Sequence, residues 1–422
     1  MSTTAIIGGG VIGLLAAYEL HRRGVDVTLI DKSDFGAACS TGNAGWITPS
    51  LSGPVPAPGL VATSLKWMMD RHSPLYIRPS SLPALAPWLF QFWRHCNAAD
   101  YHAGLMATAR LAEPVMDLYD SLVEHGVEFE MHDSGILFAV LNPEYLTHLA
   151  EDLKIMRQFG YGEPLELSGG ELRDFEPEIT DAVKGALWVR EERHVRPETL
   201  TEGLVRWLTA EGVKLYPGVK VTGIRSGVST VRAIETLDGT LDVDQILIAA
   251  GAWSGEVARM AGVTLPMQAG KGYNITVNEP ELRLHHAIYF SDARVACSPF
   301  DGALRVSGTM ELSGVNTAFD PRRVEAIRHG ADRCLGDWSR GASETSWVGM
   351  RPLTPDGLPV IGRAPKLENL YLATGHSMLG ITLGPSTALT IAELMTTGKS
   401  SIDLTAFDPA RFAERTTVVR AI

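Results

Sequence analysis

Cysteine is scarce in this 422-residue chain, and the four cysteines (Cys39, Cys96, Cys297 and Cys334) lie far apart. No C-x-x-C pair or Cys/His metal spacing occurs, so we expect free thiols in a reducing cytoplasmic interior, and no metal site. No apolar run reaches the roughly 18–20 residues that a membrane-spanning helix needs. The chain enters an apolar strand pattern directly, without the basic start of a signal peptide.

Basic residues are also in the minority, with 37 Lys and Arg against 49 Asp and Glu, for a net charge of −12. A nucleic-acid-binding surface requires clustered Lys and Arg, so nucleic acid is not an expected partner. The composition, 45% hydrophobic and 20% charged, is that of a soluble globular protein. The chain is too long for one compact core, so we expect two domains.

A strand–helix–strand pattern opens the chain. Residues 4–8 read as a buried strand, 11–23 as a helix ended by Gly24, and 25–31 as a second strand. This order predicts an α/β fold with a Rossmann-like nucleotide-binding domain. Helix and strand patterns at 197–224, 243–253 and 370–397 indicate further parts of the same domain. Residues 266–348, by contrast, are rich in predicted strands. We therefore expect a nucleotide-binding domain from 1–50, 191–265 and 346–422. It is interleaved with an α+β substrate domain from 51–190 and 266–345, carrying a mixed or antiparallel sheet.

Three glycines stand between the first strand and the first helix in the spacing G-x-G-x-x-G. Gly8 allows a tight turn, Gly10 lets the backbone approach a pyrophosphate, and Gly13 lets helix and strand pack closely. Asp31 ends the second strand, about 20 residues on, where a carboxylate can accept hydrogen bonds from ribose hydroxyls. The alternative for Asp31 is a solvated turn residue. This pattern predicts a dinucleotide with an unphosphorylated adenosine ribose.

The segment "KSDFGAACSTGNAGW" (32–46) follows Asp31 in place of another short strand–helix unit. With its Ser40, Asn43, Ala44 and Gly45, it resembles the D-amino-acid oxidase superfamily of FAD flavoproteins. Within that superfamily it is most similar to the bacterial D-amino-acid dehydrogenase small-subunit branch. The similarity continues through 57–79, "KGYNIT" (271–276) and on to the C-terminus, although residues 140–200 depart from it. The resemblance implies FAD as the cofactor.

Two stretches near the C-terminus form a second signature of this superfamily: "WVGMRPLTPDGLPVIG" (347–362) and "LYLATGHSMLGITLGPS" (370–386). The resemblance places the turn of the second stretch against the pyrimidine side of the flavin. Backbone amides and a helix N-terminus there suit the negative charge that develops when the flavin accepts hydride. Covalent attachment in relatives uses a His where this chain has Asn43, or a Cys where it has Gly349. FAD is therefore expected to be bound non-covalently.

Three side chains are candidates for catalysis. Arg351, in the G-x-R-P motif, is expected to bind the substrate carboxylate with its guanidinium fork; the alternative is a structural pairing with Asp356 or Glu344. His376 is a potential general base, but the family transfers hydride from Cα to flavin N5 without an obligatory base, which favours a structural role. Tyr273 either reaches the substrate pocket or is a core tyrosine.

The residues expected to contact the cofactor come from all three segments of the nucleotide-binding domain. They are Ile7, Gly8, Gly10, Val11, Ile12, Gly13, Asp31, Lys32, Ser40, Asn43, Ala44, Gly45, Val221, Ala250, Gly251, Trp253, Arg351, Gly375, His376, Met378, Leu379, Gly380, Ile381 and Thr382.

The resemblance implies an enzyme that oxidises a small amino acid at its Cα–N bond, giving an imine that hydrolyses to a 2-oxo acid. A D-amino acid is the first choice; a cyclic imino acid (D-proline or hydroxyproline type) and an N-alkyl glycine such as sarcosine are alternatives. "RHVRPETL" (193–200) differs from the dehydrogenase branch, so its D-alanine preference is not carried over. A nicotinamide-dependent dehydrogenase and a non-catalytic FAD-binding subunit are weaker alternatives. The electron acceptor, oxygen or a quinone, stays open.

One aromatic stretch, "LPALAPWLFQFW" (82–93), has two readings. Its tryptophans and phenylalanines either pack into the substrate domain or touch the inner face of a membrane as a peripheral contact. Two prolines within the stretch argue against a single regular interfacial helix and favour packing into the substrate domain.

Overall fold

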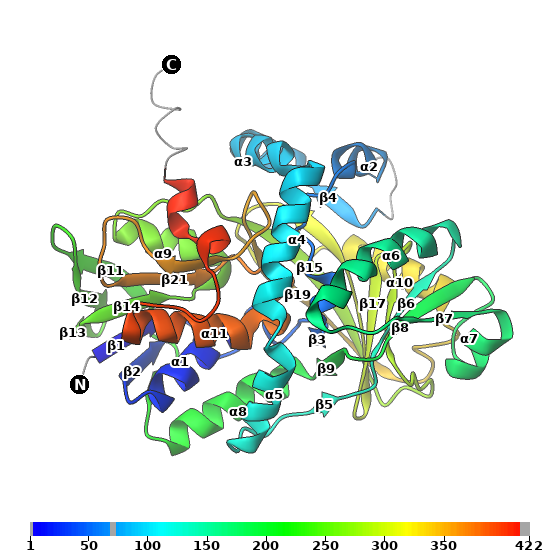
Figure 1. Ribbon diagram of the computed structural model, residues 1–422, viewed down its shortest axis with the longest axis horizontal. Coiled ribbons are helices and arrows are strands. Elements are labelled where there is room, and N and C mark those ends of the chain that lie inside the picture. Colours follow the sequence, from blue (N-terminus) through cyan, green and yellow to red (C-terminus); the bar gives the residue numbers. More distant parts are fainter. Residues whose placement is uncertain (1–2, 68–72, 414–422) are drawn as a thin grey trace.

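The computed structural model describes residues 3–67 and 73–413, and so leaves out part of the 57–79 stretch. It has two lobes that lie side by side (Figure 1). The chain passes between the lobes several times, so each lobe is built from separate segments. The predicted fold class is confirmed.

The nucleotide-binding lobe is a six-stranded sheet in the order β10 (Lys214–Tyr216), β2 (Asp26–Ile30), β1 (Thr3–Ile7), β14 (Gln245–Ile248), β21 (Leu370–Thr374) and β20 (Val360–Arg363). All neighbours are parallel except β20, which runs antiparallel to β21. Alternate residues of β1 enter different cores: Ile6 packs on one side of the sheet, and Ala5 and Ile7 on the other. Both faces are therefore covered, as is usual for parallel sheets.

Three long helices cover one face of this sheet: α1 (Val11–Arg22), α8 (Pro197–Ala210) and α11 (Gly380–Thr397). On the other face lie α9 (Ser254–Met260) and the meander of β11 (Val221–Ser226), β12 (Val231–Thr236) and β13 (Gly239–Asp242). The last helix begins at Gly380, earlier than the expected start near 384. Pro385 inside it has no N–H for the carbonyl of Ile381, and the buried hydroxyl of Tyr119 donates to that carbonyl at 2.9 Å instead.

The substrate lobe is a mixed sheet in the order β19 (Ser343–Leu353), β15 (Gln268–Asn278), β18 (Ala303–Leu312), β17 (Val295–Phe300), β16 (Ala287–Phe290), β6 (Ile136–Val140), β8 (Gly185–Val189) and β7 (Leu165–Ser168). The short β4 (Leu75–Ile77) pairs with β18. Helix α10 (Pro321–Cys334) packs on one face, where Tyr273, Ile275 and Val277 form its core with Ile327 and Ala331. The outer strands carry α6 (Glu144–Lys154) and α7 (Gly169–Phe175).

The remaining elements connect the lobes. β3 (Trp46–Ile47), β9 (Arg193–Val195) and β5 (Met131–His132) form a small sheet between them. Helices α2 (Leu60–Trp67) and α3 (Leu82–His95) lie at the top of Figure 1, above the long α4 (Ala98–Ala112) and the α5 (Val115–Glu124) that follows it. Within the described residues, every helix is too short or too polar to span a bilayer.

The packing differs from the expected boundaries in two places. Strand β19 belongs to the substrate sheet as far as Leu353, because it pairs with β15 along its whole length, so the boundary at 346 falls inside the strand. Helices α4 and α5 lie within the segment 51–190 but pack against α11 and share the nucleotide-binding core through Leu111, Val115 and Tyr119. Their apolar faces complete the layer that α1 and α11 begin.

Candidate functional site

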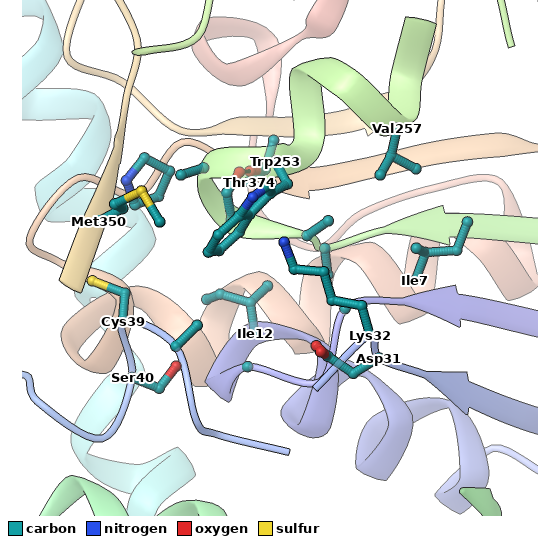
Figure 2. A pocket seen from close by; sticks show the side chains of 18 of the residues that line it. Ile7, Ile12, Asp31, Lys32, Cys39, Ser40, Trp253, Val257, Met350 and Thr374 are labelled. Carbon is teal, nitrogen blue, oxygen red and sulfur yellow. Dashed lines mark hydrogen bonds between the residues drawn. The ribbon is translucent and has the colours of Figure 1, made fainter. Parts of the chain in front are cut away.

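A cavity of about 550 Å³ opens at the carboxyl ends of β1, β14 and β21. The first turn, the loop after β2 and the N-terminal end of α11 border it, and α9 lies over it (Figure 2). Ligands of parallel sheets bind at this edge, where neighbouring strands lead into helices on opposite faces. The cavity therefore lies where the sequence places the dinucleotide.

Gly8 and Gly13 have the roles that their spacing predicts. Gly8 has φ +115°, and a Cβ there would lie 2.4 Å from the Ala249 carbonyl oxygen. A Cβ on Gly13 would lie 1.8 Å from the carbonyl oxygen of Gly8. Both contacts are with backbone atoms. A side chain at Gly13 would therefore keep α1 away from β1, and one at Gly8 would keep the turn away from the end of β14.

The amide donors at the start of α1 are partly engaged by the loop after β2. The backbone amide of Val11 donates to Ser40 Oγ at 3.0 Å, and the N-cap Gly10 has no side chain of its own to cap the helix. A Cβ on Gly10 would lie 3.2 Å from the same Ser40 oxygen, so backbone and loop approach closely here. The end of a helix dipole with such amides suits an anion such as a pyrophosphate.

Asp31 lines the cavity, but its carboxylate also shapes the turn. Its Oδ2 accepts from the Gly9 amide at 2.7 Å and its Oδ1 accepts from the Ser33 amide at 2.8 Å. Each oxygen keeps a further lone pair, so the contact with a ribose hydroxyl stays a prediction. Lys32 Nζ lies 3.4 Å from the ring centroid of Trp253, and the two side chains meet over the cavity in Figure 2. Burial lowers the pKa of Lys32.

The C-terminal turn meets the loop after β2 at the cavity. Asn43 Nδ2 donates to the carbonyl of Met378 at 3.3 Å, and Asn43 Oδ1 accepts from the Gly45 amide at 2.8 Å. The turn itself uses left-handed backbone at Gly375 (φ +78°) and Ser377 (φ +53°). Helix α11 then starts with no side-chain cap, and Gly380 and Ile381 at its first turn line the cavity.

His376 lines the cavity but is buried, with 3% of its surface exposed. Its Nε2 lies 2.9 Å from Thr387 Oγ1, within hydrogen-bond distance. Burial lowers the pKa of His376 to about 3, so the ring is neutral at ordinary pH. A group with so low a pKa is a weak general base, which favours the structural role over proton transfer.

Arg351 points away from the cavity residues that flank it in β19, because Met350 and Pro352 line the cavity and Arg351 does not. Its guanidinium crosses the neighbouring strand over Gly272, where a Cβ would lie 2.3 Å from Arg351 Cζ. Its Nη1 donates to the carbonyl of Thr309 at 2.8 Å.

The electrostatic surroundings of Arg351 are unusual for a partly buried charge. Burial lowers its pKa, and among the described residues no carboxylate forms an ion pair with it. The two acids considered as structural partners pair elsewhere, Asp356 with Arg411 and Glu344 with Arg328. Burial raises the pKa of the cavity-lining Cys39 to about 11, and the charge of Arg351 opposes that rise.

Tyr273 lies on the other face of the sheet from Gly272 and Arg351. It is 1% exposed, packs in the core under α10, and donates to Glu311 Oε2 at 2.5 Å. Burial raises its pKa. The structure therefore does not bring Tyr273 together with Arg351 or with the cavity, and its hydroxyl is satisfied as in the alternative reading.

Many of the expected cofactor residues do line the cavity. They are Ile7, Gly8, Gly10, Val11, Ile12, Asp31, Lys32, Ser40, Asn43, Val221, Ala250, Gly251, Trp253, His376, Gly380 and Ile381. The others, Gly13, Ala44, Gly45, Arg351, Gly375, Met378, Leu379 and Thr382, lie behind the wall or beside it. Thr382, for example, donates to the carbonyl of Trp46 at 3.0 Å and so joins α11 to β3.

Sequence reasoning missed several lining residues. Three of them, Ala249, Ala373 and Thr374, lie at the carboxyl ends of β14 and β21. The strand pattern in the sequence could have identified them, because ligands bind at the carboxyl ends of parallel strands. Glu256, Val257 and Met260 on α9, and Thr317 before α10, carried no local signal. Their position depends on how α9 and the substrate lobe fold over the cavity.

Fold and cavity together define a two-lobed dinucleotide-binding protein in which a substrate sheet lies against the nucleotide site. The family model described as "FAD dependent oxidoreductase" matches residues 3–394. The chain belongs to this family, which confirms the resemblance and makes it an FAD-dependent oxidoreductase.

Curated relatives include a D-amino acid dehydrogenase of Bradyrhizobium diazoefficiens, 32% identical and covering 97% of this chain and 99% of the relative. A D-amino acid dehydrogenase of Cereibacter sphaeroides is 31% identical over 92% of this chain and 91% of its own. Among solved structures, glycine oxidase from Geobacillus kaustophilus is similar with a TM-score of 0.76 and 25% identity, covering 97% of this chain and 99% of that one. L-proline dehydrogenase from P. horikoshii shares the fold, with a TM-score of 0.76 over 98% of each chain, at 19% identity.

The residues present fit FAD. Because Gly8 and Gly13 have no Cβ, the turn and the N-terminus of α1 leave room for a pyrophosphate. The cavity is lined both by Asp31 and by the N-terminus of α11. Ser40 and Asn43 border its middle. The N-termini of α1 and α11 lie side by side at this site, because a Cβ on Gly380 would lie 3.8 Å from Val11 Cγ1.

Proposed function

We propose that the enzyme oxidises the Cα–N bond of a small amino acid, with a D-amino acid as its substrate class. The single observation that carries the proposal is Arg351, a partly buried guanidinium without a carboxylate partner among the described residues, whose neighbours Met350 and Pro352 line the cofactor cavity. A carboxylate bound in bidentate fashion would compensate that charge. The D-amino acid dehydrogenase relatives support the stereochemistry.

The chain's own residues would then act mainly by binding and orientation. Arg351 holds the substrate carboxylate and thereby fixes Cα, while the neutral His376 adds no charge at the turn. FAD, when bound, supplies the acceptor for two electrons and a proton. The Cα hydrogen and two electrons would pass from the substrate to that acceptor, and a proton would leave the nitrogen for solvent, which gives the imine. Water then hydrolyses the imine to a 2-oxo acid and ammonia.

Anaerobic mixing of the FAD-loaded enzyme with D-, L- and N-methyl amino acids tests this proposal. We expect D-amino acids to bleach the visible flavin absorbance and their L-enantiomers to leave it unchanged. Bleaching by cyclic imino acids or sarcosine alone would shift the substrate class to those compounds. If no amino or imino acid bleached the flavin, the proposal would be overturned. Admitting air to the reduced enzyme then tests the acceptor: fast reoxidation indicates oxygen, and slow reoxidation indicates a quinone.

We propose further that α3 rests on the inner face of an anionic membrane, where a quinone is within reach. One side of α3 is packed: Leu85 and Trp88 are buried, and Trp88 Nε1 donates to the Pro266 carbonyl at 3.0 Å. The other side exposes Leu82, Phe90 and Trp93. The packed side agrees with the packing reading of the sequence, and the exposed side is the surface that we propose for the membrane contact.

The charge around α3 suits a negative surface although the chain as a whole carries −12. The helix contains no acidic residue and ends with Arg94 and His95, and the exposed Arg78 precedes it. His95 Nδ1 lies 2.6 Å from Asp100 Oδ2, so the two arginines are the cations available to a membrane surface. Apolar and aromatic side chains flanked by cations are typical of interfacial helices.

Vesicle sedimentation tests the membrane contact. The protein is expected to sediment with vesicles containing phosphatidylglycerol, and the double variant Phe90→Ser/Trp93→Ser to stay in the supernatant. Val228→Ser/Leu237→Ser is the matched control, because these apolar residues are 102% and 87% exposed on the nucleotide-binding lobe. Equal sedimentation of both double variants would contradict the contact.

A further inference from the structure

Three successive backbone carbonyls of the loop after β2 are held by side chains of the substrate sheet. Arg305 Nη1 donates to the carbonyl of Thr41 at 2.9 Å and to that of Asn43 at 2.8 Å. Between them, the carbonyl of Gly42 accepts from Asn274 Nδ2 at 2.8 Å. This loop is the one whose Cys39, Ser40 and Asn43 line the cofactor cavity.

Both donors stand on adjacent strands and face the loop together. Arg305 on β18 pairs with Thr276 of β15, and Asn274 lies two residues along β15 on the same face. Arg305 Nε also donates to Thr276 Oγ1 at 3.3 Å. With 5% of Arg305 and 1% of Asn274 exposed, water does not compete for these bonds.

Glu198, in the first turn of α8, completes the arrangement from the nucleotide-binding lobe. Arg305 Nη2 donates to both of its carboxylate oxygens, at 3.0 and 3.2 Å. Glu198 also accepts from Arg196 Nε at 3.0 Å, so its charge keeps one partner if Arg305 is replaced. Burial alone would raise the pKa of Glu198, but the charge of Arg305 and its hydrogen bonds lower it below its ordinary value.

The orientation of the carbonyls decides the orientation of the amides. In a planar trans peptide, C=O and N–H point in opposite directions. When Arg305 holds the carbonyls of Thr41 and Asn43, the amides of Gly42 and Ala44 point away from the sheet. Neither amide donates to any group in the described part of the chain, although the Gly45 and Asn43 amides do. Two backbone donors are thus left free on the side of the loop opposite Arg305.

We infer that Arg305 is a positioning residue for the cofactor: together with Asn274, it fixes the loop whose Ser40 and Asn43 line the FAD cavity, and so couples the substrate sheet to the flavin site. The same bonds leave the Gly42 and Ala44 amides, within the described residues, as free donors on the side of the loop away from the sheet. A guanidinium suits this role because it serves two carbonyls and a carboxylate at once. The inference depends on FAD binding alone, so it stands or falls separately from the proposed substrate.

Arg305→Gln tests it, with Arg196→Gln as the matched control, since Arg196 shares Glu198 but does not contact the loop. Folded Arg305→Gln protein is expected to bind FAD about tenfold more weakly or worse, as for the loss of charge-assisted hydrogen bonds. Its visible circular dichroism, which reports the flavin's surroundings, should change as well. Arg196→Gln should match wild type in both. If folded Arg305→Gln protein had the same FAD affinity and the same visible dichroism as Arg196→Gln, the inference would be overturned.

Asn274→Ala provides a second measurement if Arg305→Gln does not fold. It removes only the donor to Gly42, so FAD affinity should fall by about threefold to tenfold, the value of one neutral hydrogen bond. Dichroism should change in the same direction. Unchanged affinity and dichroism in a folded Asn274→Ala protein would overturn the inference even without Arg305→Gln.

Discussion

Arg351→Lys is expected to lower kcat/KM for the amino acid substrate by about 30-fold to several hundred-fold while FAD content stays at the wild-type level. Lysine keeps the charge but loses the planar guanidinium fork. That fork contacts the Thr309 carbonyl and, as we propose, binds the substrate carboxylate at two points. The loss corresponds to about 2–4 kcal/mol, as when one partner of a buried, hydrogen-bonded charge pair is altered. Steady-state kinetics and the ratio of flavin to protein absorbance measure the two effects.

Arg328→Lys is the control for this substitution, because Arg328 pairs with Glu344 at the far end of the same strand. It should leave both kinetics and FAD content unchanged. If Arg351→Lys reduced FAD content as strongly as kcat/KM, Arg351 would be a structural residue of the cofactor site rather than a substrate ligand.

Gly272→Ala gives an independent view of the same contact. The new Cβ would lie 2.3 Å from Arg351 Cζ, so the guanidinium must move while its charge and chemistry are kept. We expect a higher KM with unchanged FAD content. Gly170→Ala, where a Cβ meets nothing within 4 Å, is the matched control. An unchanged KM in Gly272→Ala would mean that the position of the guanidinium over Gly272 is not the one that binds substrate.

Gly13→Ala is expected to yield colourless protein with at least a hundredfold weaker FAD binding. Its Cβ would lie 1.8 Å from the Gly8 carbonyl oxygen, so α1 must move away from β1 and take its amides from the pyrophosphate. Losing two or more charge-assisted hydrogen bonds corresponds to a factor of about 100 or more. Titration of the apoprotein with FAD, followed by flavin fluorescence, measures the affinity.

Gly24→Ala separates this steric effect from a general cost of removing glycine. Gly24 has φ +77° but a Cβ there meets nothing within 4 Å, so the variant should be strained by about 1 kcal/mol and remain yellow. Gly10→Ala, with a contact of 3.2 Å to Ser40 Oγ, should fold and bind FAD with intermediate affinity. Full FAD content in Gly13→Ala would show that helix and strand do not need this close approach.

Much of the nucleotide site could be predicted because its requirements are local. Gly8 needs a positive φ, Gly13 needs an absent side chain, and Asp31 needs only to end the next strand, so each requirement appears at a fixed spacing. Arg351 was identified from its motif, but only the structure showed that it has no carboxylate partner among the described residues and that Asp356 and Glu344 pair with other arginines.

Tyr273 shows where the sequence stops being informative. β15 is buried on both faces along most of its length, so its residues lack the apolar–polar alternation that would distinguish the two sides. Only the register with β19 and β18 reveals that Gly272 faces Arg351 while Tyr273 faces α10. A strand that is apolar throughout cannot indicate its own orientation.

The sequence by itself determined the α/β class, the dinucleotide turn and the two segments that meet at the cofactor. These depend on backbone geometry and on residues near one another in the chain. Only the tertiary structure decided that β19 belongs to the substrate sheet, that α4 and α5 complete the nucleotide-binding core, and that Arg305 holds a loop 262 residues away. Such contacts arise from the pairing and layering of distant segments, and a buried arginine or asparagine carries no local mark of the carbonyl that it will meet.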